Sequence, residues 1–228
     1  MVKKRILLVG FLITLLIFVT IYFTNIILNK QREDAIDERM TSLIENYEEM
    51  QTLSMMSNLF GEEGTCLIMQ AQLLNMNKEI WETGRKIDQY RTITEEFMDD
   101  PFYLEQKRRF NLNEALYFSL LEQMKKSCEV NQTTLLFFYQ KKENCPDCDA
   151  QSFVLTDIRH EFDEELAIFS FDADLDLAPV AILAQYYNLT EYPCTIVEDT
   201  AHCGLYDKDD MMDILCNTSY FSECSDNP

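Results

Sequence analysis

Residues 133–150 read TTLLFFYQKKENCPDCDA: an apolar run, a short polar loop, and two cysteines separated by two residues. The run from Thr133 to Tyr139 has the uninterrupted hydrophobicity of a strand that is buried on both faces. Cys145 follows five polar or charged residues later, and the apolar spacing after it predicts a helix that opens at this cysteine. A cysteine pair in this place could be a redox disulfide, half of a zinc site or a structural crosslink.

Beyond this helix the pattern alternates between strands and helices. Strands are expected at 166–171, 194–197 and 203–206, and helices at 179–187 and 207–216. Both strand–helix–strand connections predict parallel pairing. A short turn at residues 200–202 allows the last two strands to pair antiparallel. Residues 131–220 are therefore expected to form an α/β domain, with a mixed central sheet flanked by helices.

Two motifs within this order resemble the thioredoxin-like superfamily. The first is Cys145-Pro146-Asp147-Cys148, and the second is Tyr192-Pro193-Cys194-Thr195 at the start of the next-to-last strand. The resemblance covers residues 131–220 and implies a thioredoxin-like fold that performs thiol–disulfide exchange on protein dithiols and disulfides. It implies that Cys145 attacks, that Cys148 resolves the mixed disulfide, and that a redox partner resets the pair. Pro193 would be a cis-proline beside the cysteines, with Tyr192 presenting backbone groups to the substrate; no cofactor is implied.

Charges near the cysteine pair act in opposite directions on the Cys145 thiolate. A helix N-terminus favours an anion, and Pro146 suits the first position of a helix. Carboxylates at Glu143, Asp147 and Asp149 disfavour the thiolate. Because a poorly stabilised thiolate favours the disulfide, we expect a reducing couple, with a reduction potential below about −150 mV.

The sequence departs from the superfamily pattern near the motifs. Asn144 stands where a tryptophan is usual, and the stretch 138–140 offers no match for the family's buried acidic residue. Cys194 occupies a position that is often threonine, which makes it a candidate third thiol. The pairing of Cys203, Cys216 and Cys224 is left open between Cys203–Cys216 and Cys216–Cys224.

Two other functions compete with redox catalysis. A thioredoxin-like domain can be a non-catalytic binding or scaffold module with structural disulfides. Zinc could be held by ligands from Cys145, Cys148, Cys194, Cys203 and His202, although a second C-x-x-C pair is missing and no metal is expected.

Residues 6–28 form an uncharged stretch of 23 residues near the N-terminus. As a helix it would reach about 34 Å, enough to cross a bilayer core of about 30 Å. Three basic residues at positions 3–5 favour a cytoplasmic N-terminus, so residues 1–29 are interpreted as a signal-anchor and the main domain as extracytoplasmic. Disulfides persist on that side. The alternative is a cleaved signal peptide, but the exit of this stretch has no small-x-small cleavage pattern.

Residues 30–130 are acidic and predicted to be helical. Cys66, Leu73, Ile80 and Ile87 recur every seven residues, a coiled-coil-like seam that could also support a homodimer. Asp100-Pro101 predicts the start of a further helix, with an apolar face through Leu112, Leu116, Leu120 and Met124.

Helical stretches at 66–93 and 101–128 have equal length. Folded back on each other as an antiparallel hairpin, they would bring Cys66 and Cys128 together at one end, so we expect a disulfide between them. Residues 107–109, Lys-Arg-Arg, are interpreted as a solvated face, and residues 221–228 as a tail. The net charge of −21 excludes ordinary binding to nucleic-acid phosphates.

Overall fold

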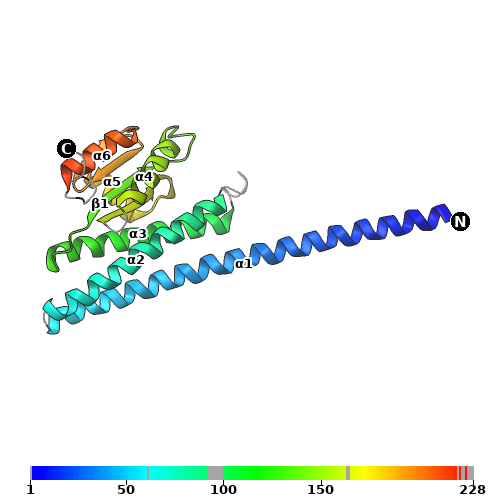
Figure 1. Ribbon diagram of the computed structural model, residues 1–228, viewed down its shortest axis with the longest axis horizontal. Helices are drawn as coiled ribbons and strands as arrows, with labels where there is room; N and C mark the ends of the chain where they lie inside the picture. The colour runs from blue at the N-terminus through cyan, green and yellow to red at the C-terminus, as the bar shows by residue number, and fades with distance from the viewer. Residues whose placement is uncertain are drawn as a thin grey trace.

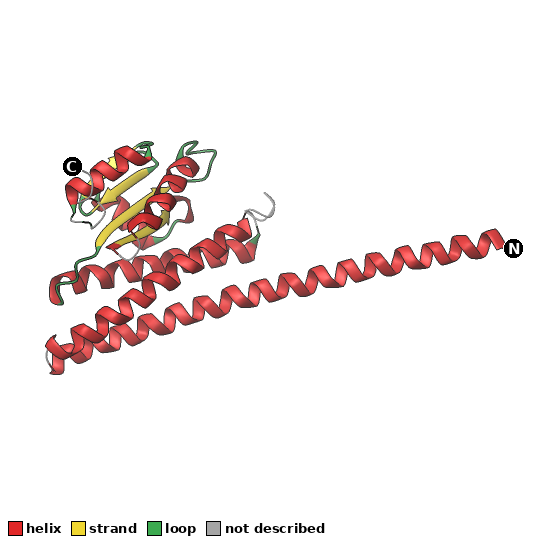
Figure 2. Cartoon of the chain, viewed as in Figure 1, coloured by secondary structure: helices red, strands yellow, loops and turns green. Residues whose placement is uncertain are grey.

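A computed structural model describes residues 2–60, 62–91, 100–162, 165–219, 221 and 224. Long helices form one part of the molecule, and a four-stranded sheet with helices on both faces forms the other (Figures 1 and 2). The helices and strands in chain order are α1 Val2–Phe60, α2 Glu62–Arg91, α3 Pro101–Ser127, β1 Thr133–Tyr139, α4 Cys148–Phe162, β2 Leu166–Asp172, the 3₁₀ turn η3 Ala173–Leu175, α5 Ala178–Tyr186, β3 Cys194–Val197, β4 Thr200–Cys203 and α6 Lys208–Thr218.

The first helix, α1, is unbroken over 59 residues and is about 90 Å long. Its N-terminal half projects beyond the rest of the molecule (Figure 1). Every large apolar side chain between Ile6 and Leu28 is at least 46% exposed. Within the described ranges, α1 is the one helix that is long and apolar enough to span a membrane.

The C-terminal half of α1 packs against α2 and α3. Its apolar stripe is buried from Ile36 onwards, and Met40 and Met50 are fully inaccessible. Contacts between α1 and α3 ascend together along both helices, so the two run parallel; α2, which connects them and contacts both, runs in the opposite direction. These contacts are Asp37 with Arg109 at 2.6 Å, Met40 with Asn113 at 3.8 Å and Ser54 with Gln123 at 3.1 Å.

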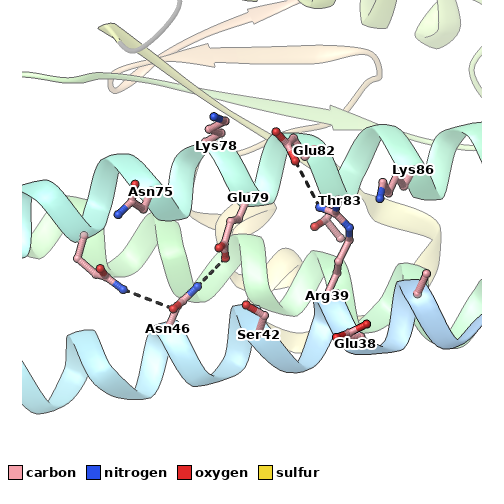
Figure 3. A pocket seen from close by; sticks show the side chains of 12 residues that line it. Glu38, Arg39, Ser42, Asn46, Asn75, Lys78, Glu79, Glu82, Thr83 and Lys86 are labelled. Atoms are coloured by element: carbon pink, nitrogen blue, oxygen red, sulfur yellow. Dashed lines mark hydrogen bonds and ion pairs between the residues drawn. The ribbon is translucent and has the colours of Figure 1, made fainter.

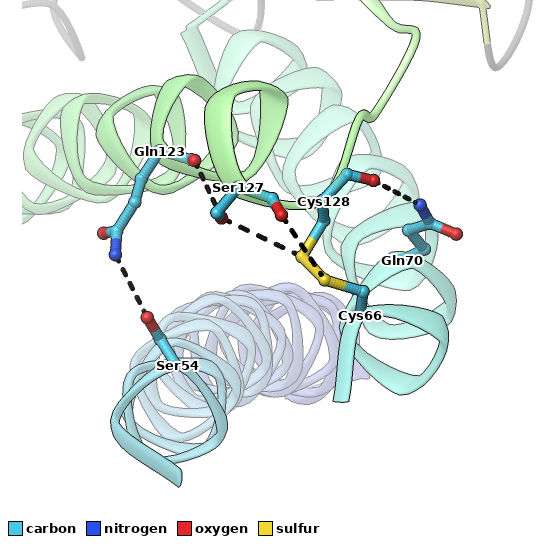
Figure 4. Close-up of a disulfide and its surroundings, with 6 residues drawn as sticks. All are labelled: Ser54, Cys66, Gln70, Gln123, Ser127 and Cys128. Carbon is cyan, nitrogen blue, oxygen red and sulfur yellow. Dashed lines mark hydrogen bonds between the residues drawn. A yellow bond between two sulfur atoms is a disulfide. The ribbon is translucent and has the colours of Figure 1, made fainter. Parts of the chain in front are cut away.

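The seam predicted along α2 is buried. Leu73, Ile80 and Ile87 are 1%, 4% and 6% exposed. At its start, Cys66 is joined by a disulfide to Cys128, the C-cap residue of α3, with a Cα–Cα distance of 5.4 Å (Figure 4). The expected disulfide is therefore present, and it closes the end of the α2–α3 hairpin.

Half of the predicted apolar face of α3 is buried, with Leu120 and Met124 5% and 0% exposed, and half is not. Leu112 and Leu116 are 39% and 38% exposed, whereas Phe110, Tyr117 and Leu121 are buried. The reason is that α3 packs on two sides, against α1 and α2 and also against β2. A single stripe of leucines four residues apart cannot describe a helix that buries two faces.

The sheet has the order β2-β1-β3-β4, with β1 and β2 parallel and the other pairs antiparallel. The prediction that the second crossover is parallel is wrong. After the nine residues of α5, the chain turns back through Asn188, whose φ is 53°, and Leu189 N–H donates to Ala184 O at 2.9 Å. Because the chain returns to the end of the sheet that it left, β3 enters beside β1 in the opposite direction.

The last hairpin is also shifted from its predicted position. The fourth strand is Thr200–Cys203, not 203–206, and the turn lies at residues 198–199. Glu198 has a φ of 51°, the left-handed conformation that two-residue hairpin turns require. This turn sets the register in which Cys194 lies opposite Cys203.

Helices cover both faces of the sheet. On one face, Leu135, Phe137 and Val197 pack with α4 and α6. On the other, Leu136, Phe138, Phe169 and Ile196 belong to one continuous core with α3, α5 and the buried stripes of α1 and α2. The rings of Tyr117 and Phe169, 5.3 Å apart, join the helical part to the sheet.

Side chains of α3 hydrogen-bond to the outer edge of β2. Ser170 N–H donates to Glu114 Oε1, and Asp172 N–H donates to Asn111 Oδ1, both at 2.8 Å. Since β2 pairs with β1 on its other side, these two side chains take the place of a neighbouring strand.

Candidate functional site

The candidate site lies where β1 and β2 end and β3 begins. Tyr139 lies opposite Asp172 in the register of β1 and β2, and Phe138 lies opposite Cys194 in that of β1 and β3. The loop that carries the cysteine pair therefore shares one end of the sheet with the turn after β2 and with the Tyr192-Pro193 segment.

Cys145 and Cys148 are joined by a disulfide, with a Cα–Cα distance of 5.4 Å. The helix begins at Cys148, not at Cys145 as predicted, and Pro146 lies in the preceding turn. Cys148 N–H donates to Cys145 O at 3.3 Å, a three-residue closure that delays α-helical geometry until the second cysteine. The helix N-terminus therefore lies at Cys148. The Cys145 sulfur is bonded directly to the sulfur of this first helical residue.

Both cysteines are buried. Cys145 is 1% exposed and Cys148 is 4% exposed. The loop residues Glu143, Pro146 and Asp147 are exposed around them. The pair therefore lies beneath an accessible loop, and a substrate sulfur can reach Cys145 only if that loop moves.

Asp174, in the turn after β2, fixes the start of the cysteine loop. Its carboxylate accepts from Lys141 N–H at 2.6 Å and from Gln140 Nε2 at 3.2 Å. Gln140 N–H in turn donates to Cys148 Sγ at 3.5 Å. These contacts link the turn after β2 to the sulfur of Cys148.

Lys107 and Asp172 form an ion pair behind the cysteine loop. The Asp172 side chain is 1% exposed, and Lys107 comes from α3. A cavity of about 70 Å³ is lined by both Lys107 and Cys148. Residues 138–140, at the end of β1, offered no buried carboxylate in the sequence. In the structure the buried carboxylate is Asp172, at the end of the neighbouring strand β2. The available signal was an aspartate directly after the second predicted strand.

The interpretation of residues 107–109 as a solvated face is incomplete: Arg108 is exposed, and Lys107 and Arg109 are half-buried. Each of the three cations has a partner from a distant part of the chain. Lys107 pairs with Asp172, Arg108 donates to Leu175 O, and Arg109 pairs with Asp37. Position in the sequence could not reveal these contacts, because they depend on α3 lying between α1 and the sheet.

The Tyr192–Pro193 peptide bond is cis, and Pro193 is buried. Pro193 O accepts from Gly204 N–H at 2.8 Å, which ties this segment to the end of β4. Burial raises the pKa of the Tyr192 hydroxyl, and the nearby Asp174 carboxylate raises it further. Tyr192 is therefore close to the same carboxylate that fixes the cysteine loop.

Cys194 is not a third thiol. It is fully buried and forms a disulfide with Cys203, its partner across the β3–β4 hairpin. Cys216 pairs with Cys224, so the alternative Cys203–Cys216 bond is wrong. The prediction of a free Cys194 failed because it placed the last strand at 203–206. With the two-residue turn at 198–199, the strand register brings Cys194 opposite Cys203.

All eight cysteines are in disulfides. No thiolate is present in this form to hold zinc through Cys145, Cys148, Cys194 or Cys203. Over the residues that the structure describes, no group of three or more His, Cys, Asp or Glu side chains is arranged to hold a metal ion.

A larger cavity of about 780 Å³ lies between α1 and α2, away from the cysteines. Polar and charged side chains line it, and an ion pair and amide hydrogen bonds cross it (Figure 3). Asn46 Nδ2 donates to Glu79 at 2.5 Å, and Arg39 lies 3.4 Å from Glu82. These pairs join the two helices, and no cysteine lines the cavity.

Comparisons with known proteins leave the family open. No protein family model matches the chain, and no curated protein matches it. A solved structure described as "Structure of a malarial protein" is 16% identical, over 38% of this chain and 97% of that one, with a TM-score of 0.34. A likeness at this level carries no argument about fold or function.

Proposed function

We propose that this chain is a membrane-anchored thiol–disulfide oxidoreductase with a thioredoxin-like domain, and that Cys145 and Cys148 are its redox pair. The sheet order, with parallel β1 and β2 and antiparallel β3 and β4, supports the thioredoxin-like assignment. So does the placement of the cysteine loop and the Pro193 segment at the same end of the sheet.

One observation carries the redox assignment: the Cys145–Cys148 disulfide joins residues only three apart. In the chain-entropy model a loop this short contributes about 2 kcal/mol to stability, against about 4 kcal/mol for the 62-residue separation of Cys66 and Cys128. A disulfide that closes so short a loop stabilises the fold less than one that joins distant elements. Its position, where a β-strand ends and a helix begins, suits chemistry better.

In the reducing direction, the Cys145 thiolate attacks a substrate disulfide, forms a mixed disulfide and releases one substrate thiolate. The Cys148 thiolate then attacks the Cys145 sulfur and releases the second substrate thiolate. Two electrons have passed to the substrate, and the pair is left as the disulfide present in the structure. In the oxidising direction the same steps run in reverse, and a partner dithiol or disulfide restores the starting state.

The position of the site along α1 favours substrates near a membrane surface. Asp37 pairs with Arg109 of α3, and Lys107, two residues earlier on α3, pairs with Asp172 at the site. Asp37 is nine residues beyond Leu28, the end of the apolar stretch, which is about 14 Å along the helix. With residues 6–28 in a bilayer, the cysteine end of the sheet would face that bilayer at short range.

The test is capture of a mixed disulfide by the full chain in lipid nanodiscs. A Cys148→Ser variant should accumulate a mixed disulfide between Cys145 and a peptide disulfide, whereas Cys145→Ser should not. A Cys216→Ser/Cys224→Ser variant, which lacks a disulfide but keeps the redox pair, is the matched control and should turn over normally. Turnover that is unaffected by Cys145→Ser would refute the assignment.

The burial of both cysteines favours a second function, a non-catalytic binding module. In that case the Cys145–Cys148 bond would only stabilise the loop, and the Cys148→Ser variant would capture no substrate. The same experiment therefore separates the two functions.

A further inference from the structure

A pocket of about 350 Å³ lies at the junction of the helical part and the sheet. We call it the Glu114 pocket. Its walls come from α2, α3, α4 and β2, and the side chains used below are Ile80, Trp81, Phe110, Glu114, Phe153 and Ile168. Pockets that hold small organic molecules are commonly about 300–1,000 Å³, largely apolar, and placed where two structural parts meet.

The polar group of this pocket is the Glu114 carboxyl. Glu114 is 2% exposed. Its Oε1 accepts from Ser170 N–H at 2.8 Å, but its buried Oε2 has no hydrogen-bond partner among the residues that the structure describes. A buried polar atom without a partner is costly, so an occupant that supplies one would be stabilised there.

Surrounding charges indicate which partner Oε2 needs. The other charged side chains that line the pocket are Arg85, Asp88 and Asp149; Arg85 is exposed and forms no ion pair with Glu114 within the described residues. An ionised carboxylate buried without a cation is strongly disfavoured. Burial accordingly raises the pKa of the Glu114 carboxyl well above its usual value. In the protonated acid, Oε1 is the accepting oxygen and Oε2 carries the hydrogen.

We propose that the Glu114 pocket binds a small uncharged molecule with an apolar body and an acceptor oxygen, such as a ketone, to which Glu114 Oε2 donates a hydrogen bond. The rings of Trp81, Phe110 and Phe153 would enclose the apolar body. Phe153 is 74% exposed and marks the entrance.

The occupant would lie next to the cysteine pair. The Glu114 pocket shares four lining residues, Asp88, Asp149, Ser152 and Ser170, with the 70 Å³ cavity lined by Cys148. Binding does not depend on redox activity, and it can be tested separately from it.

Benzophenone is a suitable probe because it is an uncharged diaryl ketone that labels its surroundings under ultraviolet light. The full chain in lipid nanodiscs is irradiated with benzophenone, and labelled peptides are quantified by mass spectrometry. Labelling within residues 6–28, which would report benzophenone dissolved in lipid, is the internal reference. We expect saturable labelling near Trp81 and Phe153, displaced by dicyclohexyl ketone and at least about tenfold less effectively by diphenylmethane, which lacks the oxygen.

Variants separate binding from folding. Glu114→Leu should reduce pocket labelling about tenfold, whereas Glu114→Gln, which keeps both an acceptor for Ser170 and a donor, should stay within about threefold. Ser152→Phe should fill the pocket and abolish labelling, and Glu105→Leu, an exposed glutamate on the same helix, should change nothing. If folded wild type is not labelled at the pocket, if diphenylmethane competes as well as the ketone, or if Ser152→Phe is labelled normally, the proposal is wrong.

Discussion

Lys107 of α3 donates to the carboxylate of Asp172, which is almost inaccessible at the end of β2. The pair connects the helical part of the chain to the end of the sheet that carries the cysteines. Lys107 also lines the small cavity of which Cys148 forms part of the wall.

Removing the Lys107 ammonium should destabilise the protein. Lys107→Met leaves the Asp172 carboxylate buried without its cation, and the free energy of unfolding should fall by about 3 kcal/mol. Denaturant unfolding of the full chain in micelles, followed by the fluorescence of Trp81, the only tryptophan, measures this. Lys126→Met, an exposed lysine on the same helix, is the control and should have almost no effect. Equal stability of the two variants would show that the pair contributes nothing.

The carboxylates around the cysteine pair should set its redox poise. Glu143 and Asp147 are exposed beside the disulfide, where they oppose a thiolate. Asp147→Asn should therefore stabilise the reduced form and raise the reduction potential by about 10–20 mV, from a wild-type value below about −150 mV. Equilibration with glutathione buffers gives the potential, with Asp213→Asn on α6 as a distant control. A wild-type value above −150 mV, or a decrease in Asp147→Asn, would contradict this explanation.

The Cys66–Cys128 disulfide should contribute more to stability than the Cys216–Cys224 disulfide. Their sequence separations are 62 and 8, so the chain-entropy model gives about 4 and about 2.5 kcal/mol. Double serine variants of each pair, compared by denaturant unfolding, check the order. Peptide mapping without reduction should recover Cys66 linked to Cys128, and free Cys66 in the native protein would exclude the bond.

Glu114 should make stability fall as pH rises. Its carboxyl has a raised pKa in the folded state, so above about pH 4.3, the ordinary glutamate pKa, the unfolded chain loses a proton that the folded chain keeps. Stability then decreases by up to about 1.4 kcal/mol per pH unit until the folded pKa is reached, and the contribution is constant above it. The difference between wild type and Glu114→Gln isolates this effect. A difference that does not change between pH 4 and pH 8 would mean that Glu114 titrates normally.

If residues 6–28 lie in a bilayer, as proposed, the distance of the cysteine pair from it should be adjustable through the length of α1. Seven helix-forming residues inserted between Arg32 and Glu33 would lengthen α1 by about 10 Å and nearly restore its rotation. Buried contacts of α1 begin only at Ile36. Reduction of a soluble peptide should be unchanged, whereas reduction of a disulfide attached to a lipid-anchored peptide should fall several-fold. Equal rates on both substrates would show that the height of the site is unimportant.

Features that depend on local pattern could be predicted from the sequence. Asp100 caps α3 through its side chain and Pro101 follows it, as the Asp-Pro pair indicated. Cys66 and Cys128 meet because α2 and α3 fold back on each other, as the matching lengths of the stretches 66–93 and 101–128 predicted. The strand before Cys145 was evident from its apolar residues alone.

Features that depend on strand register or on packing between distant segments could not be predicted. The Cys194–Cys203 bond requires a two-residue turn at Glu198, and the residues following that turn gave no clear strand boundary. The buried Asp172 needs Lys107 from a helix more than sixty residues earlier. The burial of Cys145 depends on how its loop folds over the end of the sheet, which a C-x-x-C motif does not specify.

The hydrogen bonds that Glu114 and Asn111 accept from the backbone of β2 limit how this protein can associate with other chains. A polypeptide that joined the sheet as an extra strand would have to displace both side chains from this border. The opposite border, formed by the short strand β4 with exposed Thr200 and Ala201, has no such cover among the described residues. Strand addition, whether by another peptide or by self-aggregation, is therefore directed to β4.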